Sequence, residues 1–145
     1  MKTIKFYRTE DLNGCLSNFA LFPVTVDGKM WLTAEHYYQA MKSLDPAVQE
    51  DIRNLRSPAA TKQIGSKVNL RKDWEEVKDD IMYKVVKAKF EQHEELTEHL
   101  LSTGDAELIE DSPWDYYWGC GKRGNGKNML GVILMRVRKE LKEQT

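Results

Sequence analysis

The chain has 145 residues, a length that suits one domain able to bury a core without disulfides or a structural metal. Charged residues make up 31% of the chain and apolar residues 41%, a balance typical of globular proteins. A net charge of -1 gives no overall electrostatic case for nucleic-acid binding, so any anion site must be local.

The two cysteines, Cys15 and Cys120, do not form a C-x-x-C pair, and the three histidines are scattered. Neither a disulfide framework nor a metal site is predicted. The N-terminus lacks the apolar stretch of a secretion signal, and no apolar run approaches the roughly 18 residues of a membrane span. We therefore expect one cytoplasmic domain over residues 1–145, without metal, cofactor or membrane contact.

The first third of the chain is predicted to contain β-structure. The segment IKFY, residues 4–7, is a short strand candidate. In FPVTVDGKMWL, residues 22–32, Asp27 and Gly28 lie between two apolar segments, which is a strong signal for a β-hairpin.

From Thr33 onward the chain is predicted to be mainly helical. Thr33 can cap a helix over residues 34–44, and two more helices are expected to start at Asp45 and Ser57, each followed by proline. The longest helix is predicted from about residue 73 to 92, with one apolar stripe. The stripe consists of Trp74, Val77, Ile81, Val85 and Ala88.

A further helix in EELTEHLLST, residues 94–103, is expected to stop at Gly104, and AELIED, residues 106–111, is a strand candidate. Beyond a glycine-rich loop, apolar residues from 129 to 141 keep helical spacing. They predict a C-terminal helix capped by Asn128.

The glycine-rich loop, WGCGKRGNGKNMLG, nearly matches the P-loop G-x-x-x-x-G-K-[ST] between Gly121 and Asn128. A P-loop needs a hydroxyl at the last position to bind magnesium, and this chain has Asn128 there. The preceding residues form no apparent buried strand, and too little chain follows for the rest of that fold. Nucleotide hydrolysis is therefore rejected.

The loop keeps two properties that suit a phosphate group. Its glycines permit a close approach of the backbone, and N–H groups at a helix start attract anions. Lys122, Arg123 and Lys127 add positive charge. The alternative is a flexible connection that binds nothing.

Three segments carry a family resemblance: CLSNFALFPVTVDGKMWLTAEHYYQAMK, LRKDWEEVKDDIMYKVVKAKF and DYYWGCGKRGNGKNMLGVILMRVR. In this order they resemble the NADAR family (NAD- and ADP-ribose-associated), which includes the YbiA-type N-glycosidases. The blocks T-A-E-H-Y and W-G-x-G-x-x-G-x-G-K-N-x-L-G are specific in combination. The departures at Tyr38, Met41 and Trp114 leave the exact substrate open.

The resemblance implies a mainly helical α+β fold in a single compact domain, with the hairpin near its N-terminus. It also implies a hydrolase that cleaves the N-glycosidic bond between a ribose and a nitrogenous group. The implied substrates are phosphorylated ribosylamine intermediates of riboflavin synthesis, or ADP-ribose on guanine bases in DNA or RNA. A non-catalytic module that binds ADP-ribose or a nucleotide is the alternative from another class.

Three residues are predicted to be catalytic. Glu35 falls in a first helical turn, where it could act as a base or stabilise a cationic sugar, or be an ordinary first-turn Glu. Lys42, seven residues later and so on the same helix face, could form a Schiff base with the opened sugar, clamp phosphate or be solvated. Asp115 is a second carboxylate for proton transfer, or a turn cap.

The residues predicted to bind substrate are Asn18, Trp74, Trp118, Gly119, Gly121 and Asn128. Either tryptophan could stack on a base, although Trp74 could equally belong to the core. Asn18 could orient a sugar hydroxyl or lie in a turn. The remaining three belong to the predicted phosphate-binding loop.

Overall fold

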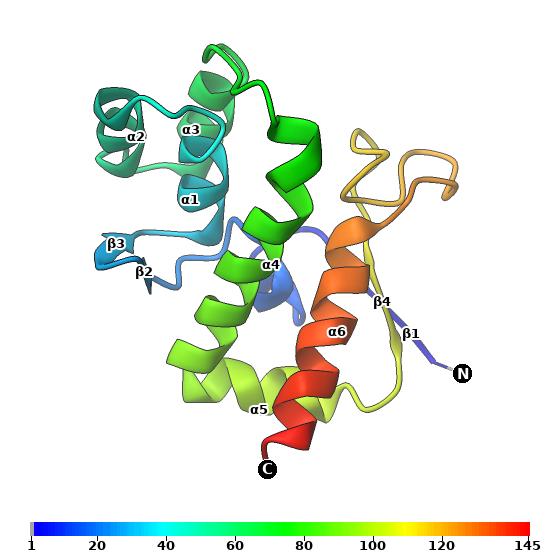
Figure 1. Ribbon diagram of the computed structural model, residues 1–145. Helices are drawn as coiled ribbons and strands as arrows, with labels where there is room; N and C mark the ends of the chain where they lie inside the picture. The colour runs from blue at the N-terminus through cyan, green and yellow to red at the C-terminus, as the bar shows by residue number, and fades with distance from the viewer. Residues whose placement is uncertain (1) are drawn as a thin grey trace. The chain divides into compact units, whose positions relative to one another are not determined.

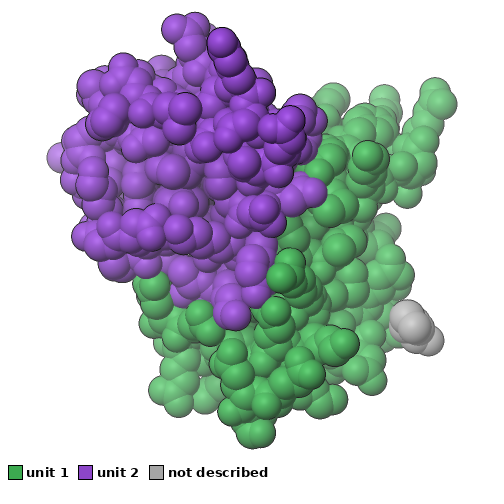
Figure 2. Space-filling view, in the orientation of Figure 1, with its two compact units in different colours: residues 1–20, 90–145 green, residues 21–89 purple. Residues whose placement is uncertain are grey.

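The computed structural model describes residues 2–145, which fall into two compact units (Figures 1 and 2). Unit 1 comprises residues 1–20 and 90–145, and unit 2 comprises residues 21–89. The predicted mainly helical α+β class is confirmed. In chain order the described elements are β1 (Thr3–Phe6), η1 (Gly14–Leu16), β2 (Val24–Val26), β3 (Lys29–Trp31), α1 (Ala34–Ala40), α2 (Pro46–Arg53), α3 (Pro58–Gly65), α4 (Trp74–Gln92), α5 (Glu94–Ser102), β4 (Glu107–Glu110) and α6 (Met129–Glu143).

The predicted hairpin opens unit 2, where β2 and β3 pair antiparallel with Val24 opposite Trp31. Asp27 and Gly28 have φ angles of 51° and 81°, the left-handed conformation that a tight two-residue turn requires. Lys84 of α4 donates to both oxygens of Asp27, at 2.8 and 3.0 Å. This ion pair fixes the turn on the long helix.

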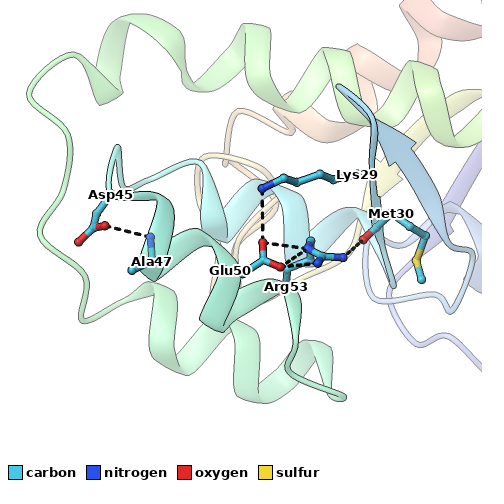
Figure 3. Close-up of polar contacts among 6 residues, drawn as sticks. All are labelled: Lys29, Met30, Asp45, Ala47, Glu50 and Arg53. Atoms are coloured by element: carbon cyan, nitrogen blue, oxygen red, sulfur yellow. Dashed lines mark hydrogen bonds and ion pairs between the residues drawn. The ribbon is translucent and has the colours of Figure 1, made fainter.

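A cluster of charges joins the hairpin to α2 (Figure 3). Glu50 accepts from Lys29 Nζ at 3.4 Å and from the guanidinium of Arg53. Arg53 also donates to the carbonyl of Met30 at 3.2 Å. Hydrogen bonding to Arg53 lowers the pKa of Glu50 to about 2, because it stabilises the ionised carboxylate.

All three predicted helix starts in unit 2 are confirmed. The side chains of Thr33, Asp45 and Ser57 each accept a backbone N–H from the first turn of the helix that follows. Figure 3 shows the second of these caps, where Asp45 accepts from Ala47 N at 2.9 Å. A cap of this kind supplies a partner for one otherwise unpaired N–H group.

The end of α1 was predicted wrongly, because the helix stops at Ala40 rather than at residue 44. The N–H groups of Lys42 and Ser43 bond three residues back instead of four. The carbonyl of Lys42 accepts from Arg71 N at 2.8 Å, which removes it from the helical ladder. A long-range backbone contact therefore terminates this helix.

The apolar stripe of α4 also differs from the prediction. Within it Trp74 and Val85 are buried, whereas Val77, Ile81 and Ala88 are only partly covered. The other buried side chains of this helix are Met82, Val86, Lys89 and Phe90. The buried face of α4 is therefore shifted by one residue toward the C-terminus relative to the predicted stripe. It includes Lys89, which a hydropathy pattern counts as polar.

In unit 1, β1 and β4 pair in parallel, with Thr3 opposite Glu107 and Phe6 opposite Glu110 (Figure 1). Helix α6 packs against β4. Gly131 allows the close approach, because a Cβ there would lie 2.1 Å from the carbonyl oxygen of Leu108. A glycine is therefore required by packing at this position.

The sequence predicted that Asn128 caps α6. Asn128 does occupy the N-cap position, but its side chain makes no capping hydrogen bond. Its backbone is left-handed, with φ 52°. The side-chain amide donates to Leu108 O and accepts from Glu110 N, both at 2.9 Å. Asn128 therefore provides β4 with the pair of hydrogen bonds that a neighbouring strand would provide.

Replacing Asn128 with glycine tests this bridge, because glycine tolerates the left-handed backbone but lacks the amide. We expect Asn128→Gly to lower the free energy of unfolding by about 1–3 kcal/mol in urea titrations, since two backbone groups of β4 lose their partner. Asn128→Ala should cost about 1 kcal/mol more, because alanine disfavours the left-handed region. Asn125→Gly, at an exposed loop position, is the control. Equal stability of Asn128→Gly and the parent would contradict the bridge.

Candidate active site

All seven residues of α1 are buried. A helix buried on every side is normally apolar, yet this one carries the polar side chains of Glu35, His36 and Gln39. A buried polar group is costly unless it finds a hydrogen-bond partner. The contacts of these three side chains therefore define the chemistry of the helix.

Glu35 lies at the second position of α1, as predicted, and its side chain is 6% exposed. Gln39, one turn later, donates from Nε2 to Glu35 Oε2 at 2.6 Å. A carboxylate in this first turn is also favoured by the positive end of the helix dipole. Both features favour an ionised carboxylate that is shielded from water.

His36 anchors the same turn. Its Nε2 lies 2.9 Å from the carbonyl oxygen of Leu55, so this nitrogen carries the proton and donates. Nδ1 is then an acceptor, and it takes the hydroxyl proton of Thr33 at 2.7 Å. Burial lowers the pKa of His36 although the bond to Leu55 opposes the effect. A neutral imidazole thus fixes the segment that carries Glu35.

Lys42 lies two residues beyond the end of α1, so helical spacing no longer relates it to Glu35 as the sequence had suggested. Its Nζ lies 5.5 Å from the ring centroid of Tyr38 and 6.0 Å from that of Trp74. Aromatic faces attract a cation, so this setting favours the ammonium form of the lysine.

Arg71 holds the segment around Lys42 in place. It pairs with Asp73 through two hydrogen bonds, of 2.6 and 3.1 Å, and its Nη1 donates to Met41 O at 3.3 Å. Hydrogen bonding to Arg71 lowers the pKa of Asp73. No role in fixing the backbone of Lys42 had been predicted for Arg71 from the sequence.

Trp74, proposed as a stacking residue, is 5% exposed and packs against Tyr38 with ring centroids 5.3 Å apart. The burial agrees with the core alternative, and stacking on substrate stays a prediction. Trp74, Tyr38 and Lys42 form one aromatic-cation cluster in unit 2.

In unit 1, Asp115 adopts the turn-cap geometry considered from the sequence. Its Oδ1 accepts from Tyr117 N at 2.9 Å and from Trp118 N at 2.7 Å. Trp118 is 8% exposed and meets the ring of Tyr117 edge-on at 4.8 Å. Asp115 therefore shapes the segment that leads into the glycine loop, whether or not it also transfers protons.

The glycine loop uses most of its backbone donors internally. Donors to groups within unit 1 are the N–H groups of Cys120, Gly121, Lys122, Gly124, Gly126, Lys127, Asn128, Met129 and Leu130. Gly121 has φ 72°, and a Cβ on it would lie 2.3 Å from the ring of Tyr116. A Cβ on Gly119 would lie 3.0 Å from Asp115 O. Gly121 is therefore required by packing, and Gly119 lies in a tight position. Phosphate binding by the loop stays a prediction, for which the exposed side chains of Lys122, Arg123 and Lys127 are the available donors.

Cys120 is not a nucleophile in this arrangement. Its Sγ lies 3.4 Å from both Asp111 Oδ1 and Gly121 O, so the single thiol proton can be donated to either oxygen. Burial raises the pKa of the thiol, and the hydrogen bond to Asp111 raises it further. The protonated thiol is the favoured form, and a protonated thiol is a poor nucleophile.

The predicted site residues fall into both units. Unit 2 holds Glu35, Lys42 and Trp74, and unit 1 holds Asn18, Asp115, Trp118, Gly119, Gly121 and Asn128. Asn18 is buried, at 6% exposure. The catalytic and binding roles of all nine stay predictions. Gln39 was missed, although its position four residues after Glu35 on a predicted helix was a readable signal.

Among residues 2–145, no group of three or more His, Cys, Asp or Glu side chains could hold a metal ion. None of the helices described combines the length and apolar character that crossing a bilayer requires.

The NADAR domain model matches residues 5–142. This chain belongs to the NADAR family. The NADAR protein is 49% identical over 140 residues to N-glycosidase YbiA of Escherichia coli (strain K12), covering 95% of this chain and 88% of that one. The NMR structure of E. coli YbiA matches it with a TM-score of 0.92 and 48% identity, over 99% of this chain and 86% of that chain.

A longer relative, Riboflavin biosynthesis protein VVA0006 of Vibrio vulnificus, is 40% identical over 142 residues. The match covers 97% of this chain but 39% of that protein. The resemblance stated from the sequence motifs is confirmed. With 49% identity to a named N-glycosidase over nearly its whole length, the NADAR protein is an enzyme, a hydrolase acting on N-glycosyl bonds.

The lowered pKa of His36 predicts how stability depends on pH. As the pH falls below the ordinary value of 6.5, the unfolded chain takes up the histidine proton before the folded chain does. The contribution of His36 to the free energy of unfolding is therefore fully present above pH 6.5 and declines as the pH falls below it. We expect the free energy of unfolding to fall between about pH 7.5 and pH 5, and to fall less in His36→Gln. Urea titrations across this range would contradict the assignment if both proteins gave the same slope.

Proposed function

We propose that this NADAR protein hydrolyses the N-glycosidic bond of a phosphorylated ribosylamine-type substrate, of the kind found among riboflavin biosynthesis intermediates. Water adds across the bond between C1 of the ribose and the nitrogen. The nitrogen leaves as an amine with the added hydrogen, and C1 gains the hydroxyl to give ribose 5-phosphate. The names of YbiA as an N-glycosidase and of VVA0006 as a riboflavin biosynthesis protein support this class.

The shielded carboxylate of Glu35 carries the proposal. Cleavage of an N-glycosidic bond passes through a sugar with positive charge at C1. A buried negative charge stabilises such a cation more strongly than a solvated one, because less water screens the interaction. At 6% exposure and with one oxygen held by Gln39, Glu35 suits this role.

Lys42 is proposed to act on the open-chain form of the sugar. Its neutral amine adds to C1 of the imine, a proton passes to the departing nitrogen, and the base leaves as an amine. Water then adds to the Lys42 Schiff base, which releases the sugar and restores the lysine. Since its aromatic neighbours favour the ammonium form, this route requires that Lys42 first lose a proton.

Asp115 is proposed as the base that takes a proton from the attacking water. Its Oδ1 accepts two backbone N–H groups, from Tyr117 and Trp118. This leaves Oδ2 for proton transfer.

Removal of ADP-ribose from guanine bases in a polynucleotide is the second candidate. One observation favours it: Trp114 is 78% exposed in the segment before the glycine loop, which presents Lys122, Arg123 and Lys127. An exposed aromatic residue and exposed cations in one stretch of the chain suit base stacking and contacts with the backbone of a single strand. The near-neutral charge of the chain favours the small molecule.

Glu35→Gln is expected to reduce kcat by about 100-fold or more, since it removes the negative charge but preserves the shape. The assay follows the release of ribose 5-phosphate from a pyrimidine that carries a 5-phosphoribosylamino group. Glu76→Gln is the matched control, because Glu76 lies in the first turn of α4 but is exposed. Circular dichroism checks that both variants are folded. Turnover of Glu35→Gln near the parent rate would contradict the assignment.

The same assay separates the substrates when it is run in parallel on an oligonucleotide with ADP-ribosylated guanine. Release from the oligonucleotide alone would replace the small-molecule proposal with the second candidate. Binding of ADP-ribose by calorimetry without release from either substrate would indicate a non-catalytic module.

The Schiff base proposed for Lys42 is tested by reduction with borohydride during turnover. We expect a stable sugar adduct on Lys42, located by peptide mass spectrometry, because borohydride reduces the imine to an amine. Lys42→Arg should give no adduct, since it retains a cation but not an amine. Lys87→Arg is the control, because Lys87 also lies over an aromatic ring, that of Tyr83 at 5.7 Å. Turnover without an adduct would leave Lys42 as a binding cation.

A further inference from the structure

We propose that Gln39 is a positioning residue that holds the carboxylate of Glu35 ionised and in a fixed rotamer. The inference rests on the proposed role of Glu35. It adds a second residue of α1 to the active site, one that touches neither the substrate nor the reacting atoms.

The hydrogen bond between the two side chains has a defined direction. Gln39 Nε2 and Glu35 Oε2 are 2.6 Å apart, and both residues are buried, at 3% and 6% exposure. An ionised carboxylate accepts hydrogen bonds but donates none, so the amide must present its NH2 group to it. The arrangement therefore fits the ionised form of Glu35 and disfavours its protonation.

The opposite end of the amide shows that the position does not serve packing alone. Gln39 Oε1 is buried and has no hydrogen-bond partner among residues 2–145. A buried carbonyl without a partner costs free energy that an apolar side chain of similar size would not. Methionine would fill the space without this cost, so the hydrogen bond that the other end of the amide donates to Glu35 accounts for a glutamine here.

Gly65, the last residue of α3, holds the amide in place. A Cβ at Gly65 would lie 2.0 Å from Gln39 Oε1, 2.7 Å from its Cδ and 2.9 Å from its Cβ. Helix α3 packs against α1, and its backbone at Gly65 meets the side chain of Gln39 directly. The amide is thus held between this backbone and Glu35, and any larger residue at 65 would displace it.

Gln39→Met removes the donor at nearly constant volume. We expect kcat to fall by about 10- to 100-fold, because a loss of this size corresponds to the free energy of one hydrogen bond to a charged group. KM should change by less than about threefold. We also expect the acidic limb of the kcat/KM profile to move to higher pH, because an unsupported carboxylate protonates more readily. Resistance to urea should fall, because the buried carboxylate of Glu35 loses a hydrogen-bond partner. The shift of the pH profile is therefore the readout that a purely structural role would not predict.

Gln39→Glu provides a rescue that depends on pH. At neutral pH the introduced carboxylate repels Glu35 and activity should be low. As the pH falls the two groups come to share one proton, and the protonated partner can donate to Glu35. The ratio of variant to parent activity should therefore rise toward lower pH.

Gly65→Ala and Thr61→Val complete the set. Gly65→Ala leaves Gln39 in the chain but displaces its amide, so it should reproduce the kinetic loss and the profile shift of Gln39→Met. Thr61 lies on α3 one turn before Gly65, and its Oγ1 is likewise buried without a partner. Thr61→Val removes that polar group without contact to Glu35 and should leave kcat and the pH profile unchanged.

The outcomes separate this inference from the function on which it rests. If Glu35→Gln is inactive while Gln39→Met keeps the parent kcat and pH profile, the positioning role of Gln39 is overturned and the role of Glu35 stands. If Glu35→Gln retains full turnover, the proposed function fails first. Equal kinetic losses in Thr61→Val and Gln39→Met would also overturn the inference, since they would show a general response of the packing between α1 and α3.

Discussion

The burial of α1 on every side is the constraint on which the candidate site depends. A seven-residue helix that is fully covered gains most of its stability from packing, since it is too short to be stable alone. Each polar side chain on it must then be satisfied by the protein or lose free energy. Thr33 and Leu55 satisfy His36, and Gln39 binds Glu35. Thr33 and His36 thus fix the start of the helix, and Gln39 separately holds the carboxylate of Glu35 one turn away.

Hydrogen bonds also fix the segment that follows the C-terminal end of α1. Arg71 binds the carbonyl groups of Met41 and Lys42, and its own guanidinium is fixed by two bonds to Asp73. Rotation of the segment after α1 would break these bonds together. Lys42 thus projects from a backbone with little freedom toward the rings of Tyr38 and Trp74, although it lies outside regular secondary structure.

Local signals made the helix starts and the hairpin predictable. The predictions that were wrong concern features that depend on residues distant in sequence. A cap and its proline act within four residues, and an Asp-Gly turn within two. The end of α1 depends on Arg71, some thirty residues later, and the side chain of Asn128 turns away from its own helix to pair with β4. The N–H groups of the glycine loop are used in hydrogen bonds within unit 1, and the spacing of the glycines in the sequence does not predict these bonds. The Glu35–Gln39 pair was readable, because it lies within one turn.

The distribution of unsatisfied polar atoms points to the same helix. Among the described residues of unit 2, buried side-chain atoms without a hydrogen-bond partner are Trp31 Nε1, Gln39 Oε1 and Thr61 Oγ1. Gln39 belongs to α1, and the other two belong to β3 and α3, which both pack against it. Folded proteins leave few such atoms, and they tolerate the cost most readily where function requires a polar group. Only the unsatisfied carbonyl of Gln39 belongs to a side chain that binds Glu35, so its cost is consistent with the role proposed for this pair on α1.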